Sequence, residues 1–348
     1  MVSIRILCRK ITSLNPVCLD YQDLLSGKDL SSQILEAYCN NGLGLLTVKN
    51  IAGYSEKRQN LLPLAQKLAL LSDHEKSLLE KPEDFYAVGW SHGKERFEGE
   101  PDYSKGSYYA NPEIDTAPVP GEWPNNVWPK KSLPELEGAF KTLGQEMIRI
   151  GILLSIHLDQ FIQARHKNYV PGTLENIIKS HKSHVGRLLH YFPQPGSDKN
   201  WCGWHNDHGA LTALTSSMYL NQSTGEVMSS NEIADQKIGL FIKDRKGELC
   251  KVRAGADELC FQIGETAQIL SGGILKATPH AVFAQGLKNH VTRNTFAVFM
   301  EPKHNFNLVS VNAENVFIEH PDVPSLKARW SPGMNFGEFH KKTIAAFY

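Results

Sequence analysis

The order of helix-like and strand-like segments constrains the fold of this chain more than any other feature. A long amphipathic stretch from Leu136 to Phe161 carries apolar residues at steps of three and four, and Ser132 precedes it as the expected cap. From Val185 to Pro302 the pattern changes to short β-rich runs separated by Gly-containing turns. Helices followed by a strand-rich half predict an α+β protein in which helices buttress a β-barrel or jelly roll.

Two segments are expected to form one structural unit. Residues 1–120 are expected to be a flank of helices and strands, and residues 121–348 to hold the long helix and the jelly-roll core. In the flank, apolar spacing predicts helices over 30–40 and 55–81, and strands at 16–20 and 45–48. The Gly-rich, aromatic stretch 85–112 is expected either to line a substrate pocket or to form a loop held to the core by its rings.

Composition narrows the choice of partner. The chain has 348 residues, of which 41% are hydrophobic and 21% charged, as in an ordinary globular protein. Its 37 basic and 37 acidic residues give a formal net charge of zero, which removes the electrostatic reason to expect nucleic acid or an anionic membrane as partner. A small-molecule substrate is the expected partner, and a monomer and a homodimer are both compatible with the sequence.

Cysteine usage and the N-terminus bear on location. The six cysteines include no Cys-x-x-Cys pair, and no apolar run approaches the roughly 20 residues that span a bilayer. We therefore expect free thiols in a reducing compartment and a cytoplasmic location. The start of the chain is too short and too charged for a secretory signal, although Arg5, Arg9 and Lys10 without an acid before Asp20 leave an organelle-targeting segment open.

A short segment in the strand-rich half has the pattern of a metal site. Residues two apart in a strand share a face, so His205 and Asp207 are expected to point at one ion. His280, from a later strand, would complete a set of two imidazole nitrogens and one carboxylate oxygen. That facial donor set is typical of non-heme Fe(II) oxygenases.

A second pair of residues has the pattern of an anion clamp. Arg293 and Thr295 share one strand face by the same parity, ahead of the apolar run 296–302. A guanidinium and a hydroxyl on one face are suited to binding a carboxylate. A dicarboxylate such as 2-oxoglutarate would fit between the metal and this clamp.

With these motifs, the chain resembles the isopenicillin N synthase-like branch of the Fe(II)- and 2-oxoglutarate-dependent dioxygenases. The resemblance covers most of the chain and rests on His-Asn-Asp-His-Gly-Ala-Leu-Thr at 205–212, Gln-Ile-Gly-Glu at 262–265, Thr-Pro-His at 278–280 and Arg-Asn-Thr-Phe-Ala-Val-Phe at 293–299.

The resemblance implies a double-stranded β-helix core and an oxidoreductase that couples 2-oxoglutarate decarboxylation to hydroxylation or another oxidation of a small molecule. It implies Fe(II) bound by His205, Asp207 and His280, with dioxygen as oxidant and ascorbate as a supportive reductant. Arg293, Thr295 and Tyr191 would bind the cosubstrate, and no catalytic residue beyond the metal ligands is expected.

Two departures from the family pattern stand out. Family members carry a second Tyr in an Asn-Tyr-Tyr-Pro motif where this chain reads His190-Tyr191-Phe192-Pro193, so one cosubstrate-binding hydroxyl is missing. The spacing between Asp207 and His280 is also long, and the excess is expected in a surface loop at 221–237 that shapes the mouth of the site.

Three alternatives remain open from the sequence. The first is an Fe(II) oxidase of the same fold that does not use 2-oxoglutarate, which Phe192 favours. The second is a hydrolase that binds zinc through the same three residues. The third is a barrel that binds small molecules without turnover. The identity of the substrate is not encoded in any recognised motif.

Overall fold

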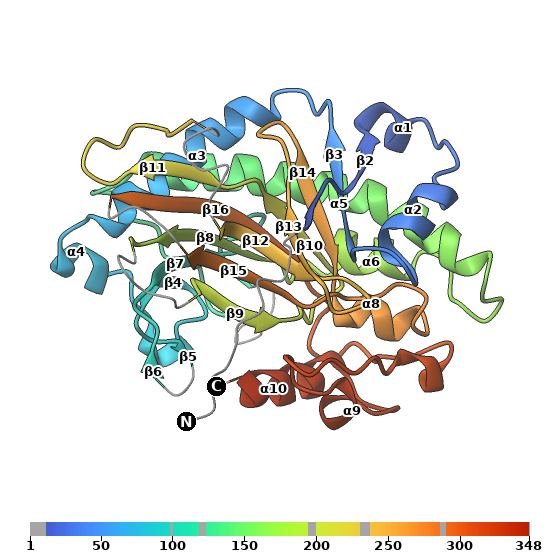
Figure 1. Ribbon diagram of the computed structural model, residues 1–348. Coiled ribbons are helices and arrows are strands. Elements are labelled where there is room, and N and C mark those ends of the chain that lie inside the picture. The colour runs from blue at the N-terminus through green and yellow to red at the C-terminus, as the bar shows by residue number, and fades with distance from the viewer. Residues whose placement is uncertain are drawn as a thin grey trace, which may run out of the picture.

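The computed structural model describes residues 12–97, 100–117, 123–193, 200–229, 237–285 and 290–347. Within these ranges the chain forms two main sheets, and the helices lie outside them (Figure 1). The mixed α+β class expected from the sequence is therefore correct. The residues expected to bear on targeting, Arg5, Arg9 and Lys10, lie outside the described ranges, as does Cys8.

The larger sheet contains nine strands, with the order β2-β3-β14-β10-β16-β8-β7-β4 and β11 paired to β16. Strands from both expected segments of the chain lie in it side by side. Its members are β2 (Val17–Asp20), β3 (Leu45–Lys49), β4 (Gly89–His92), β7 (Lys105–Ala110), β8 (Val185–Tyr191), β10 (Leu211–Thr215), β11 (Met218–Asn221), β14 (Leu259–Ile263) and β16 (Val291–Met300).

The smaller sheet has the order β1-β13-β12-β15-β9. Its pairings are antiparallel except that of β1 with β13. Its members are β1 (Thr12–Leu14), β9 (Cys202–His205), β12 (Lys237–Lys243), β13 (Leu249–Val252) and β15 (His280–Gln285), and a separate hairpin is formed by β5 (Arg96–Phe97) and β6 (Glu100–Pro101).

Helices cover the larger sheet and one end of the sandwich. In Figure 1, α9 and α10 are grouped below the strands, and α3 and α5 lie on the upper side. The helices are α1 (Tyr21–Leu25), α2 (Ser31–Tyr38), α3 (Tyr54–Ala69), α4 (Asp73–Ser77), α5 (Glu135–Gln163), α6 (Thr173–Ser180), α8 (Glu265–Leu270), α9 (Leu326–Arg329) and α10 (Phe336–Phe347), with short 3-10 turns η1 (Pro82–Asp84) and η2 (Ala313–Val316).

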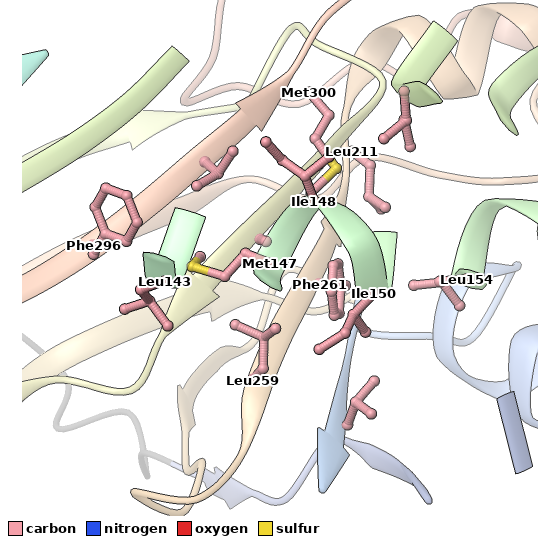
Figure 2. Close-up of a cluster of buried hydrophobic side chains, with 14 of the residues drawn as sticks. Leu143, Met147, Ile148, Ile150, Leu154, Leu211, Leu259, Phe261, Phe296 and Met300 are labelled. Atoms are coloured by element: carbon pink, nitrogen blue, oxygen red, sulfur yellow. The ribbon is translucent and has the colours of Figure 1, made fainter. Parts of the chain in front are cut away.

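The main core lies between α5 and the larger sheet. Figure 2 shows apolar side chains of α5, including Leu143 and Met147, against Phe261, Phe296 and Met300 of the strands. Phe261 and Phe296 are fully buried. Because each buried large apolar side chain contributes about 1.5–3 kcal/mol, this layer fixes the sheet that carries Arg293 and Thr295.

Three local expectations need correction. Residues 55–81 do not form one helix: α3 ends at Ala69, and Ser72 begins α4 with a capping box in which it pairs with Glu75. Ser132 does not cap α5, whose first turn follows Pro134 without a side-chain cap. The stretch 85–112 is not a loop, since it supplies β4 to β7, and Gly106 allows the ring of Trp90 to pack on the backbone.

Candidate metal centre and anion clamp

The three predicted metal ligands converge at one end of the smaller sheet. His280 is the first residue of β15 and is paired directly with His205, the last residue of β9. The two rings lie 4.2 Å apart between centroids. Asp207 Oδ1 lies 4.0 Å from His205 Nε2 and 3.7 Å from His280 Nε2. The three ligand atoms all lie within 4.8 Å of one another, so one cation can contact all of them.

The parity argument for Asp207 needs one correction. β9 ends at His205, so Asp207 lies in the loop before β10 and not on a strand face. The loop backbone, rather than strand alternation, brings its carboxylate to the two rings. His280 does lie on a strand, as expected.

Hydrogen bonds to the backbone orient both imidazole rings. The Nδ1–H of His205 donates to the carbonyl of Gly203 at 2.8 Å, and that of His280 donates to the carbonyl of Thr278 at 3.2 Å. Each ring, once neutral, therefore presents the lone pair of Nε2 to the centre, next to Asp207. This outer contact fixes the tautomer and orientation that a metal ligand needs.

The electrostatic surroundings differ between the two histidines. Burial and the neighbouring His205 lower the pKa of His280 to about 4, so its ring is neutral at pH 7. Burial opposes charge on His205 as well, yet the negative charge of the Cys202 sulfur, 3.8 Å from Nδ1, and that of Asp207 raise the pKa of that ring to about 9. Metal binding would displace this proton, since only the neutral ring coordinates.

The N-terminus of α8 holds the loop that carries Asp207. The N–H groups of Gly264, Glu265 and Thr266 donate to the carbonyls of Ala210, Asp207 and Gly209 at 3.1, 2.8 and 3.1 Å. A Cβ atom at Gly264 would lie 2.0 Å from the Gly209 carbonyl oxygen. Only glycine permits this close approach of the two segments.

A buried ion pair between Arg329, from the C-terminal region, and Glu265 stabilises the same loop. Arg329 donates two hydrogen bonds to Glu265, at 2.7 and 2.6 Å, and Asn206 Nδ2 donates to Glu265 Oε1 at 3.1 Å. The Gln-Ile-Gly-Glu motif drew attention to Glu265, but the sequence analysis missed Arg329. It is 64 residues away in sequence, and no local pattern marks it.

The expected clamp residues lie on β16, within the sandwich. Arg293 is only 2% exposed, its Nε donates to Ser217 Oγ at 2.7 Å, and its Nη1 is buried without a hydrogen-bond partner among the described residues. Tyr191 is paired with Arg293 across β8 and β16, and its ring lies 4.6 Å from the guanidinium carbon. An orphaned buried guanidinium nitrogen fits an anionic ligand.

Thr295 is already engaged within the protein. Its hydroxyl donates to the carbonyl of Thr215 at 3.1 Å and lies 3.3 Å from the Thr215 hydroxyl. To bind the cosubstrate, the Thr295 hydroxyl must either accept a further hydrogen bond while it donates to Thr215 or give up that hydrogen bond. The role of Thr295 as a cosubstrate ligand stays a prediction.

Arg293 lines a cavity of about 550 Å³ that does not include the three metal ligands in its wall. The described part of the 221–237 segment reaches this cavity through Val227 and Met228, while residues 222–227 are exposed and residues 230–236 lie outside the described ranges. The structure thus brings the three predicted metal ligands together, and it places Arg293 and Thr295 on β16 with Tyr191 beside Arg293 on β8.

A charged network that the sequence analysis missed lies on the inner side of β7 and β8. Arg187 Nη2 lies 2.5 Å from Glu95 Oε1, to which the Tyr109 hydroxyl donates at 2.6 Å, and Lys105 Nζ lies 3.2 Å from Glu95 Oε2. Burial raises the pKa of Glu95, but Arg187 and Lys105 outweigh it and hold the pKa well below its usual range. Only the aromatic residues of stretch 85–112 hinted at a site here.

Comparison with known proteins gives a match at the level of structure. No protein-family model and no curated protein matches the sequence. A putative 2OG-Fe(II) oxygenase family protein from Caulobacter crescentus has 16% identity and a TM-score of 0.67, with 97% of this chain and 99% of that chain covered.

Two further solved structures show the same likeness. A full-length Neurospora crassa protein in complex with alpha-KG has 19% identity and a TM-score of 0.65, covering 94% of this chain and 95% of that one. JOX2 in complex with 2OG, Fe and JA has 15% identity and a TM-score of 0.65, covering 97% and 90%. The chain therefore has the fold of the 2OG-Fe(II) oxygenases over nearly its whole length.

Proposed function

We propose that this protein is a non-heme Fe(II)- and 2-oxoglutarate-dependent dioxygenase of the isopenicillin N synthase-like branch that oxidises a small molecule. The observation that carries the proposal is the convergence of His205, Asp207 and His280 within 4.8 Å, in a fold shared with solved 2OG-Fe(II) oxygenases. Two of those solved proteins contain 2OG, under that name or as alpha-KG, and one also contains Fe.

The order of the strands supports a double-stranded β-helix as the core. The larger sheet includes the run β14-β10-β16-β8 and the smaller sheet the run β13-β12-β15-β9. Followed along the chain, β8, β9, β10, β12, β13, β14, β15 and β16 fill these two four-strand runs in the manner of a jelly roll. Because flank and core strands share one sheet, we also propose that residues 1–120 and 121–348 form one structural unit.

The donor set fits Fe(II). Two neutral imidazole nitrogens and one carboxylate on one side of a cation leave the opposite positions free for other ligands. When bound, Fe(II) and 2-oxoglutarate supply the oxidising chemistry, in which dioxygen is activated as the cosubstrate loses carbon dioxide. His205 and His280 hold their rings in place through Gly203 and Thr278, and Arg293 is suited to pair with the distal carboxylate.

The inner face of β7 and β8 supports a polar substrate. Two cross-strand pairs lie on this face: Lys105 is paired with Tyr191, and Tyr109 with Arg187. The charges of Lys105 and Arg187 both help to lower the pKa of the Cys202 thiol, which lies next to His205. The charged network therefore lies near the metal centre. A substrate with hydrogen-bonding groups suits this wall better than a hydrocarbon.

The testing experiment is a screen of polar metabolites for substrate-dependent conversion of labelled 2-oxoglutarate to succinate, with Fe(II) and ascorbate added. We expect at least one substrate to raise succinate formation and oxygen uptake together in the wild type, and neither in Asp207→Ala. Full substrate-dependent turnover in Asp207→Ala would overturn the metal assignment.

A second candidate is an Fe(II) oxidase that does not use 2-oxoglutarate. It is favoured by Phe192 in place of the family tyrosine. Oxygen uptake without succinate formation would select this candidate. Turnover with bound zinc and no oxygen uptake would select the hydrolase instead.

A further proposal concerns the location of the protein. The described cysteines are all free thiols, which supports a cytoplasmic location. No helix within the described ranges has the length and apolarity needed to cross a bilayer.

A further inference from the structure

A second group of metal-ligating side chains lies beside the first, and the proposed function does not use it. His208 follows Asp207 in the same loop, Glu301 directly follows β16, and His340 lies on α10. The sequence analysis gave none of them a role. The cluster therefore joins three elements: the metal-site loop, the end of the central strand and the C-terminal helix.

The geometry of this cluster suits one cation. His208 Nε2 and His340 Nδ1 share a hydrogen bond of 2.8 Å, His208 Nε2 lies 3.6 Å from Glu301 Oε1, and the three candidate ligand atoms all lie within 4.8 Å of one another. Metal–ligand bonds of roughly 2.0–2.2 Å place tetrahedral ligands roughly 3.3–3.6 Å apart, so a bound cation would replace the hydrogen bond and move the two nitrogens apart by about 0.5–0.8 Å. The ring of Phe336 stacks on His208 at 5.8 Å with an interplanar angle of 10°, which limits rotation of that ring.

Without a cation the cluster leaves a buried acid poorly compensated. Glu301 is 8% exposed, and His208 Nε2 lies 3.6 Å from its Oε1, beyond the usual length of a hydrogen bond. Two imidazole nitrogens and a buried carboxyl group from three different elements are a donor set that a divalent cation can bind.

We propose that His208 Nε2, His340 Nδ1 and the Glu301 carboxylate bind a second divalent metal ion, of which Zn²⁺ is the best fit. Two nitrogens and one carboxylate oxygen are an established zinc donor set. The site is distinct from the first, because consecutive residues in the loop, Asp207 and His208, serve the two clusters. A metal here would attach α10, seen below the strands in Figure 1, to the end of β16.

The test uses the full chain stripped of metal and loaded with Zn²⁺ alone, with bound zinc measured after equilibrium dialysis. We expect two equivalents in the wild type, one in His340→Gln, one in Asp207→Ala and none in the double variant. Glu301→Gln should also bind one equivalent. His304→Gln is the matched control: its ring lies 5.6 Å from that of His340 but outside the cluster, so this variant should keep two equivalents.

A second readout separates a lost ligand from a damaged fold. Zn²⁺ should raise the midpoint of thermal unfolding of Asp207→Ala and leave that of the Asp207→Ala, His340→Gln double variant unchanged, with equal far-ultraviolet circular dichroism. Zinc stoichiometry of two in His340→Gln, or of one in the wild type, would overturn the proposal. Because the measurement needs no turnover, its failure is distinguishable from failure of the proposed oxygenase function.

Discussion

Arg329 and Glu265 form a bidentate ion pair, 2.6 and 2.7 Å long, in which both side chains are at least 97% buried. Glu265 donates its backbone N–H to the carbonyl of Asp207, so the pair connects α9 to the loop of the metal centre. Removing one partner of a buried pair leaves an unpaired charge, which is far more costly than losing an exposed pair.

Replacing Arg329 with Gln should lower the free energy of unfolding by about 3–5 kcal/mol. It should also weaken metal binding by roughly 10–100-fold, since groups that orient ligands tune affinity. Denaturant titration and Co²⁺ binding measure the two effects. Lys327→Gln, at an exposed position of the same short helix, should change stability by less than about 0.5 kcal/mol. Equal stability of the two variants would contradict the bracing role.

Gly264→Ala should displace the Asp207 loop, because the new Cβ would meet the backbone of Gly209 at 2.0 Å. We expect a metal affinity reduced by at least tenfold, measured by Co²⁺ titration. Gly138→Ala is the matched control, since nothing lies within 4 Å of its added Cβ on α5. That substitution should stabilise the helix by about 0.5–1 kcal/mol and leave metal affinity intact. Unchanged affinity in Gly264→Ala would show that the loop does not need this approach.

Arg293→Lys should raise the KM for 2-oxoglutarate by roughly 10–100-fold while changing kcat much less. Lysine keeps the charge but loses the planar donor fork and the stacking on Tyr191. Steady-state kinetics at varied 2-oxoglutarate concentration measures KM and kcat separately, and circular dichroism checks that the variant is folded. A KM equal to that of the wild type would mean that the cosubstrate binds elsewhere.

His190 should make stability depend on pH. Burial lowers its pKa to about 4 from an ordinary 6.5, and its Nδ1–H donates to Asn294 Oδ1 at 2.8 Å. Because the neutral ring is favoured in the fold, its contribution is present above pH 6.5 and is lost as the pH falls towards 4. When the pH is lowered from 7.5 to 5, the free energy of unfolding of His190→Gln should fall by about 2 kcal/mol less than that of the wild type.

The check for His190 is denaturant unfolding at the two pH values. His290→Gln, at an exposed position, should keep the pH dependence of the wild type. If the free energy of unfolding of His190→Gln fell on acidification as much as that of the wild type, the buried ring of His190 would not be the source of the pH dependence.

Local patterns were enough to predict the elements whose residues repeat over several turns or alternate cleanly. The apolar steps from Leu136 to Phe161 correspond to α5, Glu135–Gln163, and the run at 45–48 corresponds to β3. The break between α3 and α4 was missed because the leucine stripe continues past Ala69, while a local capping box at Ser72 starts a new helix. Competing hydrogen bonds, not hydrophobic spacing, decide that boundary.

The three candidate metal ligands were predictable because the family motifs contain them and because one residue separates His205 from Asp207, even though the strand that carries His205 stops before Asp207. The residues that support them were not predictable. Arg329 reaches Glu265, and His340 reaches His208, only through packing of the C-terminal helices, and no spacing in the sequence encodes those contacts. The network of Glu95 and Arg187 likewise depends on strand register.

The most direct test of the central claim is anaerobic Fe(II) titration of the metal-free chain followed by addition of 2-oxoglutarate, with visible absorption and succinate measured on the same samples. The wild type should bind iron at the His205, Asp207 and His280 site, develop the charge-transfer band of a chelated 2-oxo acid, and form succinate once oxygen is admitted. His280→Gln should show neither the band nor succinate. A wild-type protein without the band and without succinate, or a His280→Gln variant that keeps both, would contradict the account.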